Sequence, residues 1–566
     1  MSAFDRLIVQ PRPTDGPYPV GRAEDDAAHS PSLGLLVLTA AAGVALYARF
    51  LLDPANRGDW LPYTLVVVAE TVLVVHALLS MWTILSGGEN PRGFAFHHAQ
   101  DRLYDEAQIV RTQAEGEPWR WEMYLGERPV GVDVFVTTYG EDLAVIRRTV
   151  SAALAMRGAH LVWVLDDGHS DEVRDLAAEL GARYVRRLGN HGAKAGNINH
   201  ALTLARGELF AVLDADFVPL PDFLHETVPF FAEDEVAFVQ TPQTYGNLDT
   251  VISRGAGYMQ AVFYRFIQPG RNRFNAAFCV GTNVVFRRSA VESVGGMYTD
   301  SKSEDVWTSL LLHERGWRSV YIPTTLAIGA TPETVEAYSK QQLRWATGGF
   351  EIMLSHWPWA RNRSLTVDQK VQYTVTATNY LTGIAPMLLL LVPPLQIYFG
   401  LAPMALSITP LTWLAYYAGF YALQVLLAFY TLGSFRWEVL LLASVSFPIY
   451  VRALVNAVLH RDQAWHVTGS KGQYRSPFAF IQPQVFAFVL LAATTVVGAW
   501  KDMGDGYPSL ALAWNATNTL ILGGFLLTAL RESRQARREA TRARGQHSVH
   551  ARKVRAGDLV LAGGGR

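Results

Sequence analysis

The stretch VGVDVFVTTYGED, residues 130–142, decides the fold of the central part of this chain. It is a run of β-branched and aromatic residues that ends in polar groups, which is typical of a buried strand carrying functional side chains at its carboxyl end. Two further stretches repeat the pattern, LVWVLDDG at 161–168 and ELFAVLDADF at 208–217. Helical patterns separate the strands at 142–155, 171–180 and 195–205. The sequence therefore predicts an open parallel α/β sheet with a ligand crevice along one edge.

Acidic residues follow the ends of these strands. Asp214 and Asp216 form an Asp-x-Asp pair, which puts two carboxylates within reach of one hard divalent cation, Mg²⁺ or Mn²⁺, of the kind that bridges phosphate oxygens. Asp166 and Asp167 are candidates for contacts to a ribose or base, and Lys194 of HGAKAGNINHA offers a cation to phosphate or sugar. The alternative is that the acids only cap the following helices. Acids at two successive strand ends favour a nucleotide-diphosphate site.

The composition indicates a membrane protein. Of the 566 residues, 50% are hydrophobic and only 17% are charged, which is too apolar for a soluble chain of this size. The net charge of −1 gives no reason to expect a nucleic-acid partner. The single cysteine, Cys279, excludes an internal disulfide framework and a Cys-rich metal site. Neither the G-x-G-x-x-G fingerprint nor a G-x-x-x-x-G-K-[ST] loop occurs, which argues against dinucleotide oxidoreductases and P-loop enzymes.

Six apolar stretches are long enough to cross a bilayer. They lie at 33–52, 61–85, 374–399, 409–432, 484–501 and 508–530. The tail 531–555 has nine Lys/Arg against two Glu, so it is expected in the cytosol. A seventh span at 437–459 would put the tail on the other side from the soluble region. Because Pro448 and Arg452 also disfavour a span, we expect 437–459 to lie in the interface.

These features predict five parts of the chain. They are a cytosolic tail at 1–30, a transmembrane pair at 31–85, a cytosolic α/β domain at 86–370, a membrane region at 371–530 and a basic cytosolic tail at 531–566.

The stretch AYSKQQLRWATGG, residues 337–349, is expected to be a helix with Thr331 as its N-cap. Gln341, Arg344 and Trp345 then share one helical face. An amide, a guanidinium and an indole together suit a sugar-binding surface. The alternative is an interfacial helix with Trp and Arg at the headgroup level.

The stretch SKSEDVW, 301–307, places Glu304 and Asp305 at the start of another helix. If sugar is transferred with inversion, one carboxylate must take the proton from the acceptor hydroxyl, and Asp305 is the candidate base. The alternative is that both acids only complement the helix dipole.

The ordered set TTYGE, DDG, HGAKAGNIN, DAD, QTPQ, SED and QQLRW resembles the processive family-2 glycosyltransferases of the bacterial cellulose synthase type, over roughly residues 130–475. The resemblance implies a glycosyltransferase A-type (Rossmann-like) cytosolic domain inserted in a helical membrane bundle.

It also implies roles for individual residues. Thr137, Tyr139, Glu141 and Asp167 would form the uridine pocket, Asp214 and Asp216 would hold diphosphate and metal, and Asp305 would be the base, with Ser303 in place of the family's threonine. Gln341, Arg344 and Trp345 would bind the acceptor sugar at the mouth of a membrane channel, together with Glu304, and Cys279 of FCVGTN would form a wall of the acceptor path.

The stretch WHVTGSKG, 465–472, resembles the family's gating loop, expected within 461–476. Trp465 replaces the family's Phe, Val467 and Thr468 match, and Lys471 sits one residue later than in the family. RQARR, 534–538, looks like the Arg motif of a PilZ barrel, but the remaining residues are too few to build one, so no PilZ domain is expected in this chain.

The expected function is an inverting, processive polymerase that makes a cellulose-like β-1,4 glucan from UDP-glucose and translocates it across a bacterial inner membrane. Its expected partners are the UDP-sugar, the growing polysaccharide, the lipid bilayer and an accessory or periplasmic export subunit. The alternatives are a β-1,3 or mixed-linkage glucan, chitin-like or hyaluronan-like product, a non-processive lipid glycosyltransferase, and a transporter or scaffold with an inactive domain.

Overall fold

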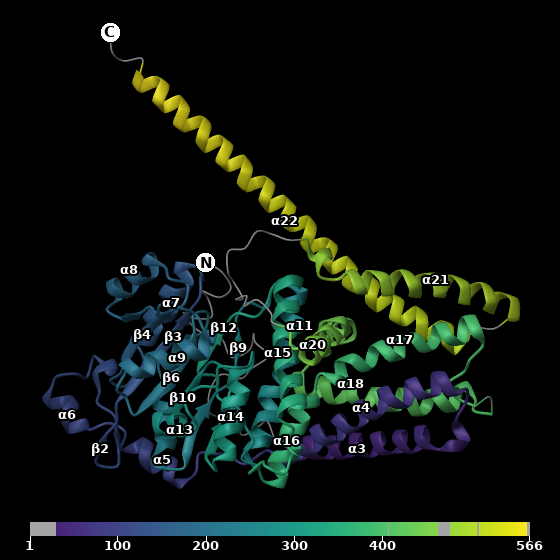
Figure 1. The fold of residues 1–566 in the computed structure, drawn as a ribbon, viewed down its shortest axis with the longest axis horizontal. Helices are drawn as coiled ribbons and strands as arrows, with labels where there is room; N and C mark the ends of the chain where they lie inside the picture. The colour runs from purple at the N-terminus through teal and green to yellow at the C-terminus, as the bar shows by residue number, and fades with distance from the viewer. Residues whose placement is uncertain (1–29, 406, 462–475, 507–508, 563–566) are drawn as a thin grey trace.

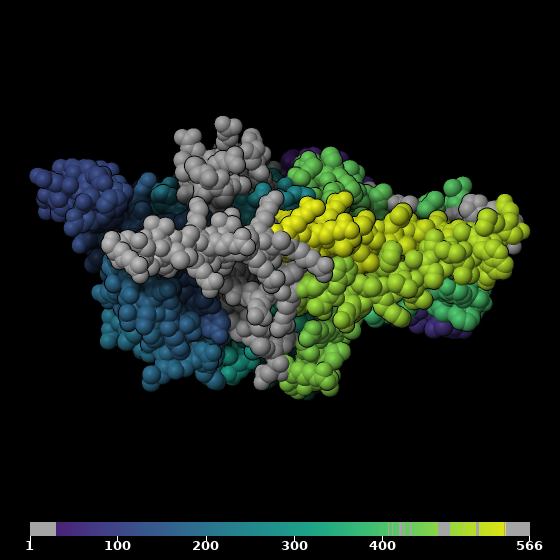
Figure 2. Space-filling view, turned by 90° about the horizontal axis from the view of Figure 1, so that it is seen from above, coloured from purple at the N-terminus to yellow at the C-terminus, as the bar shows by residue number. Residues whose placement is uncertain are grey.

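The computed structural model describes residues 30–405, 407–461, 476–506 and 509–562. A soluble α/β domain lies beside a bundle of long apolar helices (Figure 1). Seen from above in Figure 2, the bundle extends away from the blue soluble domain as one elongated lobe, with the yellow-green and yellow helices of the carboxyl-terminal part on the visible face.

The soluble domain is built on a seven-stranded sheet in the order β11–β8–β10–β6–β3–β4–β5. Its strands are β3 (Val132–Thr138), β4 (Leu161–Asp166), β5 (Arg183–Val185), β6 (Leu209–Asp214), β8 (Val236–Gln240), β10 (Val284–Arg287) and β11 (Arg318–Tyr321). The predicted parallel strands β3, β4 and β6 are confirmed. The sequence did not predict β10, which lies between β6 and β8 and is antiparallel to both.

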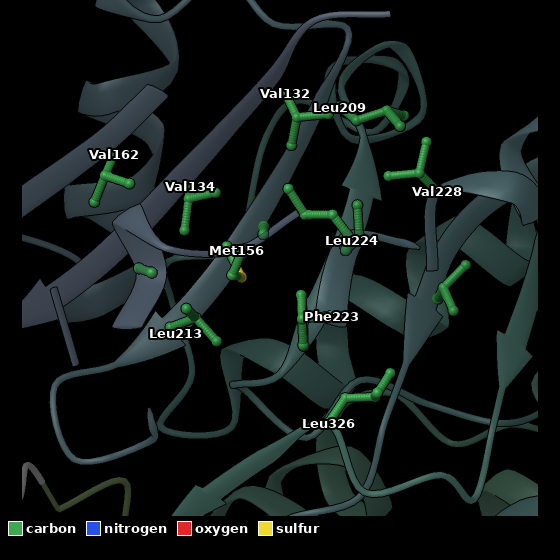
Figure 3. Close-up of a cluster of buried hydrophobic side chains, with 14 of the residues drawn as sticks. Val132, Val134, Met156, Val162, Leu209, Leu213, Phe223, Leu224, Val228 and Leu326 are labelled. Carbon is green, nitrogen blue, oxygen red and sulfur yellow. The ribbon is translucent and has the colours of Figure 1, made fainter. Parts of the chain in front are cut away.

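The sheet is buried on both faces. Side chains alternate along each strand, and those on either face are mostly apolar. Val134 and Val136 of β3 point into one apolar cluster, whereas Phe135 points into another on the opposite face. Figure 3 shows part of the first cluster, in which Val134 and Leu213 of adjacent strands lie near Met156. This two-sided core fixes the strand ends, and hence the groups that follow them.

The helices that follow the strands begin where the sequence supplies caps. They are α7 (Leu143–Leu154), α8 (Asp171–Leu180) and α9 (Ala193–Leu204), close to the predicted ranges. Asp142 accepts a hydrogen bond from the backbone N–H of Ala144, and Ser170 accepts one from Val173. Minor sheets complete the domain: β1 (Tyr124–Leu125) with β2 (Arg128–Pro129), and β7 (Val218–Pro219), β12 (Ala327–Gly329) and β9 (Thr244–Tyr245).

Helices also connect the soluble domain to the membrane bundle. Those that contact bundle helices are α11 (Val251–Val262), α12 (Gln268–Asn272) and α15 (Val335–Ser355), and α16 (Val367–Thr378) leads into the bundle. The other helices of the soluble domain are α5 (Phe94–Asp101), α6 (Glu106–Arg111), α10 (Phe223–Thr227), α13 (Arg288–Ser293) and α14 (Glu304–Glu314). The predicted N-cap of the QQLRW helix was wrong: α15 begins later, and Thr334 accepts the capping hydrogen bond from Ala337. Thr331 is held outside the helix because its backbone N–H donates to Asn247.

Five described helices are long and apolar enough to cross a membrane, which makes the chain an integral membrane protein. They are α3 (Pro31–Leu52), α4 (Trp60–Ser86), α17 (Leu381–Phe399), and parts of α21 (Gln482–Asp505) and α22 (Leu510–Ala562). A further helix, α18 (Pro410–Leu432), has 23 residues without a charged side chain and packs along α3, where Tyr416 stacks on Phe50 at 4.3 Å. The ambiguous segment forms two helices, α19 (Trp437–Val445) and α20 (Phe447–Val458), bent by 42°.

Candidate active site

A cavity of about 680 Å³ opens where the strand ends meet α14, α15 and α20. Of the residues predicted from the sequence, those that line it are Thr137, Tyr139, Glu141, Asp167, Lys194, Asp214, Asp216, Glu304, Asp305, Gln341, Arg344 and Trp345. Residues separated by some 200 positions in the sequence therefore meet in one space.

The register of the parallel strands brings the first group together. Thr137 of β3 lies opposite Asp214 of β6, and its hydroxyl donates to Asp214 Oδ1 at 3.2 Å. Beyond the strand, the backbone N–H of Tyr139 donates to Glu141 Oε2 at 2.7 Å, which turns the Glu141 side chain back toward the strand ends. Burial raises the pKa of Glu141. The strand edge therefore presents a dense group of acceptors to the cavity.

The two neighbouring aspartates of DDG have different surroundings. Asp167 lines the cavity and is held by Arg187, whose Nε and Nη2 donate to its two carboxylate oxygens at 2.7 and 2.6 Å. The structure does not bring Asp166 to the cavity. Its carboxylate is buried and accepts hydrogen bonds from the backbone N–H groups of Gly168 and Ser170 and from the hydroxyl of Tyr184. Asp166 thus holds the turn after β4, and its predicted contact with the nucleotide is corrected.

Asp214, Asp216 and Lys194 form the charged centre of the cavity. The ammonium of Lys194 donates to Asp214 Oδ1 and, at 2.6 Å, to the carbonyl of Gly281. Burial raises the pKa of Asp216, and the negative charges of Asp214 and Glu141 raise it further. This excess of negative charge indicates a place where a cation is favourable.

The donor set fits a divalent cation that shares its coordination with a substrate. Among the described residues, no group of three or more His, Cys, Asp or Glu side chains converges to hold a metal ion alone. Asp214 and Asp216 supply carboxylate oxygens, the ligands that Mg²⁺ and Mn²⁺ prefer, and phosphate and water oxygens would have to complete the coordination.

Asp305 lines the same cavity at the start of α14. One of its carboxylate oxygens accepts the backbone N–H of Val306 at 2.8 Å, and the other lies against Gly281. Gly281 has φ +88°, a conformation that favours glycine, and a Cβ there would lie only 3.1 Å from Asp305 Oδ2. Burial raises the pKa of Asp305, while the positive charges of Lys194 and Arg344 lower it. Burial and the adjacent Asp305 raise the pKa of Glu304.

The face of α15 closes the cavity on its membrane side. Gln341, Arg344 and Trp345 all line it, as helical spacing predicts. Gln341 Oε1 is buried and accepts no hydrogen bond from the residues that the structure describes. It is therefore an acceptor ready for a ligand hydroxyl.

Two other predicted groups lie elsewhere. Cys279 does not line the cavity: it is buried in the apolar cluster beneath the sheet, and its sulfur accepts the backbone N–H of Gly281 at 3.3 Å. Its predicted role as a wall of the acceptor path is corrected, because the chain turns the side chain inward. The predicted gating-loop residues Trp465, Val467, Thr468 and Lys471 lie outside the described residues.

Sequence reasoning missed other residues of this cavity. They include His191, Asn197, Gln243, Lys302, Glu351, Asn456, His460 and Arg461. His191 and Asn197 belong to the HGAKAGNIN stretch, from which only Lys194 was singled out, and Gln243 belongs to QTPQ. Glu351 was detectable from its spacing, because it lies two helical turns beyond Arg344 on the same face of α15.

Comparisons with known proteins show which family the chain resembles. Residues 209–432 match the family model described as glycosyl transferase family group 2. The chain is 30% identical over 430 residues to the cellulose synthase catalytic subunit (UDP-forming) of Pseudomonas fluorescens, a match that covers 72% of this chain and 57% of that protein. It is 31% identical over 435 residues to cellulose synthase 2 of Novacetimonas hansenii, covering 72% of this chain and 27% of that protein. The chain thus spans less than two thirds of the length of either relative.

A solved mannosyltransferase from Pyrobaculum calidifontis, in complex with GDP-Man and Mn²⁺, matches 70% of this chain and 100% of its own, with 18% identity and a TM-score of 0.47. The resemblance read from the ordered motifs is confirmed by the family match and by the two cellulose synthases. Residues 209–432 are thus similar to the group-2 glycosyl transferases, and 72% of the chain is similar to two cellulose synthases, one of them a UDP-forming catalytic subunit.

Proposed function

We propose that this chain is a processive, inverting, UDP-forming hexosyltransferase that extends a β-linked glucan from UDP-glucose and passes it through its own membrane helices. The observation that carries the proposal is the shared cavity: the strand-end carboxylates, Asp305 and the α15 face of Gln341, Arg344 and Trp345 line one space. A nucleotide sugar at the strand ends would therefore meet an acceptor held by α15, the helix from which the chain continues through α16 into the membrane helix α17.

The chemistry follows from the arrangement. An acceptor hydroxyl attacks the anomeric carbon of the donor, the bond from that carbon to the diphosphate breaks, and UDP leaves. Asp305 accepts the hydroxyl proton, so one carboxylate suffices as base and the configuration inverts. Its carboxylate oxygen beside Gly281 lies close to the ammonium of Lys194, which also contacts Asp214, so base and diphosphate site adjoin.

A divalent cation bound by Asp214 and Asp216 would supply Lewis-acid stabilisation of the departing diphosphate. Lys194 adds a positive charge to the same region. The side chain of Trp345 offers an aromatic face for a sugar ring, and Gln341 offers a free acceptor for one of its hydroxyls.

The choice of glucose and of a β-1,4 linkage is supported by the names of the relatives, both cellulose synthases. The test uses purified protein in lipid with Mg²⁺ or Mn²⁺ and a panel of UDP-sugars, followed by linkage-specific hydrolases. High-molecular-mass product that forms only from UDP-glucose and is sensitive to cellulase supports the proposal. Digestion by a β-1,3-glucanase alone, product from UDP-N-acetylglucosamine, or release of a single-sugar glycolipid refutes it.

We also propose six membrane spans in a bacterial inner membrane, with the catalytic domain and both termini in the cytosol. Two contacts support a bent pair α19–α20 that returns to the side from which it started. Glu438, at its start, forms an ion pair with Arg254 of α11 at 2.8 Å, and Asn456, at its end, lines the catalytic cavity. A reporter fused after His460 should read cytosolic, and a periplasmic signal would refute this topology. An accessory export subunit remains part of the proposal, testable by co-purification.

A further inference from the structure

Glu351 lines the cavity but belongs to none of the motifs on which the proposed function rests. It lies on α15 and binds the turn formed by residues 301–303. The hydroxyl of Ser301 donates to Glu351 Oε2 at 2.6 Å, and the backbone N–H of Lys302 also donates to the carboxylate. The same Ser301 hydroxyl accepts the backbone N–H of Ser303 at 3.2 Å. One carboxylate thus fixes the whole turn.

A second contact presses the same turn against α15. Gly348 lies one helical turn before Glu351, and its backbone packs so closely on Ser303 that there is no room for a Cβ. Hydrogen bonds at residue 351 and close packing at residue 348 therefore hold the turn at two points of one helix face.

The start of α14 depends on this support. Ser303 occupies the N-cap position of α14, yet among the described residues its side chain accepts no capping hydrogen bond. The usual local means of fixing a helix start is therefore missing. Glu304 and Asp305 follow directly, so their position is set by the turn and by the helix that holds it.

The charges that face Glu351 come from two elements. Burial raises its pKa, and the positive charges of Lys302, in the turn, and His460, just after α20, lower it. Lys302 and His460 also line the cavity. These hydrogen bonds and charges oppose the rise that burial causes but do not cancel it, so the pKa of Glu351 stays above its usual value.

We propose that Glu351 is a positioning residue for the transfer reaction: it clamps the 301–303 turn to α15 and thereby sets the distance between Asp305 and an acceptor sugar held by the same helix. The inference rests on the proposed function. The base is positioned by the turn that Glu351 holds against α15, and the acceptor would be bound by Gln341, Arg344 and Trp345 of the same helix. The helix therefore sets the position of both groups. Errors of about 1 Å in such a distance lower rates by about a hundredfold.

The test compares four variants of the full-length protein in lipid. Glu351→Ala removes the clamp, Glu351→Gln keeps a hydrogen-bond acceptor of the same shape, and Ser301→Ala removes one of the clamped donors. Glu336→Ala is the matched control, because Glu336 is a carboxylate on the same helix that pairs with Lys340 at 2.7 Å and does not line the cavity. The measurements are kcat and KM for UDP-glucose, Kd for UDP, and Tm.

We expect Glu351→Ala to lower kcat by about tenfold to a hundredfold while the Kd for UDP stays at the wild-type value. Glu351→Gln should keep kcat within about fivefold of wild type with an unchanged pH profile, since a neutral acceptor replaces a charged one. Ser301→Ala should fall between the two, and Glu336→Ala should match wild type.

A wild-type kcat in Glu351→Ala overturns the inference, as does a loss of UDP affinity that parallels the loss of kcat. Equal losses in the Ala and Gln variants also overturn it, because they assign the effect to charge rather than to the clamp. If Glu351→Ala fails to fold, Ser301→Ala decides, and its wild-type kcat refutes the clamp. Failure of the wild-type protein to turn over UDP-glucose refutes the proposed function instead, so the two failures are distinguishable.

Discussion

Arg187 is expected to hold the uridine side of the cavity through its paired hydrogen bonds to Asp167. The two side chains are only 10% and 6% exposed, so the pair is largely desolvated. Arg187 also donates to the carbonyls of His191 and Ala193, at the start of α9, the helix that carries Lys194. Removing the guanidinium therefore leaves a buried carboxylate uncompensated and frees the loop that leads to the phosphate side.

The chain offers a matched control in Arg147. This residue makes the same two-pronged contact with Glu179, at 2.8 and 2.7 Å, but the side chains are 46% and 58% exposed. Breaking a buried pair destabilises by about 3 kcal/mol or more, whereas an exposed pair contributes at most about 1 kcal/mol. At about 2–4 °C per kcal/mol, Arg187→Ala should lower Tm by about 6–12 °C and Arg147→Ala by no more than about 4 °C.

The same pair of variants should separate in ligand binding. We expect Arg187→Ala to weaken UDP binding at least about tenfold, which corresponds to about 1.4 kcal/mol of lost orientation of Asp167, and Arg147→Ala to bind UDP as wild type does. Thermal unfolding and isothermal titration with UDP measure both quantities. Equal shifts of Tm in the two variants, together with an unchanged Kd for UDP in Arg187→Ala, would refute the assignment of this pair to the nucleotide pocket.

Three further predictions concern the base and the acceptor. Because Asp305 acts deprotonated, turnover should fall as the pH drops through its raised pKa. Arg344→Ala removes a positive charge that lowers this pKa, so it should move the acid limb of the pH profile to higher pH, whereas Arg344→Lys should not. Identical pH profiles in wild type and Arg344→Ala would count against an interaction between Arg344 and Asp305. Gly281→Ala should lower kcat at least about tenfold, because the added Cβ meets Asp305. Gly295 has a similar φ of +91° and no atom near an added Cβ, so Gly295→Ala should lower stability but not kcat. Equal kcat values in the two variants would contradict a role for the contact between Gly281 and Asp305. Trp345→Ala should shorten the polymer measured by size-exclusion chromatography, and full-length product would remove its role in elongation.

Much of the fold was predictable because buried parallel strands leave a plain signature. The apolar runs of β3, β4 and β6 end in polar residues, and the flanking helices begin at local caps. The antiparallel strand β10 was not predictable in the same way, because its short apolar run VVFR gives no information on direction. The start of α15 was missed because Thr331 and Thr334 carry equal local signals, and a contact with Asn247, distant in sequence, decides between them.

The site was predictable where chemistry and spacing coincide. Carboxylates at parallel strand ends must meet at one edge, and the i, i+3, i+4 spacing of Gln341, Arg344 and Trp345 must share a face. The sequence could not show which of the adjacent Asp166 and Asp167 faces the cavity. The conformation of the turn after β4 decides this, because it directs the backbone N–H groups of Gly168 and Ser170 to the Asp166 carboxylate. The inward orientation of Cys279 likewise depends on how its loop packs against the sheet.

The most direct measurement is the turnover of UDP-glucose by Asp305→Asn alongside its affinity for UDP. The substitution keeps the shape of the side chain and removes its ability to accept a proton. We expect kcat to fall by at least about a hundredfold, the contribution typical of a general base. The Kd for UDP should stay unchanged, because the groups proposed to bind the nucleotide are those at the strand ends and do not include Asp305. Wild-type turnover by this variant would show that Asp305 is not the base and that the cavity works by another mechanism.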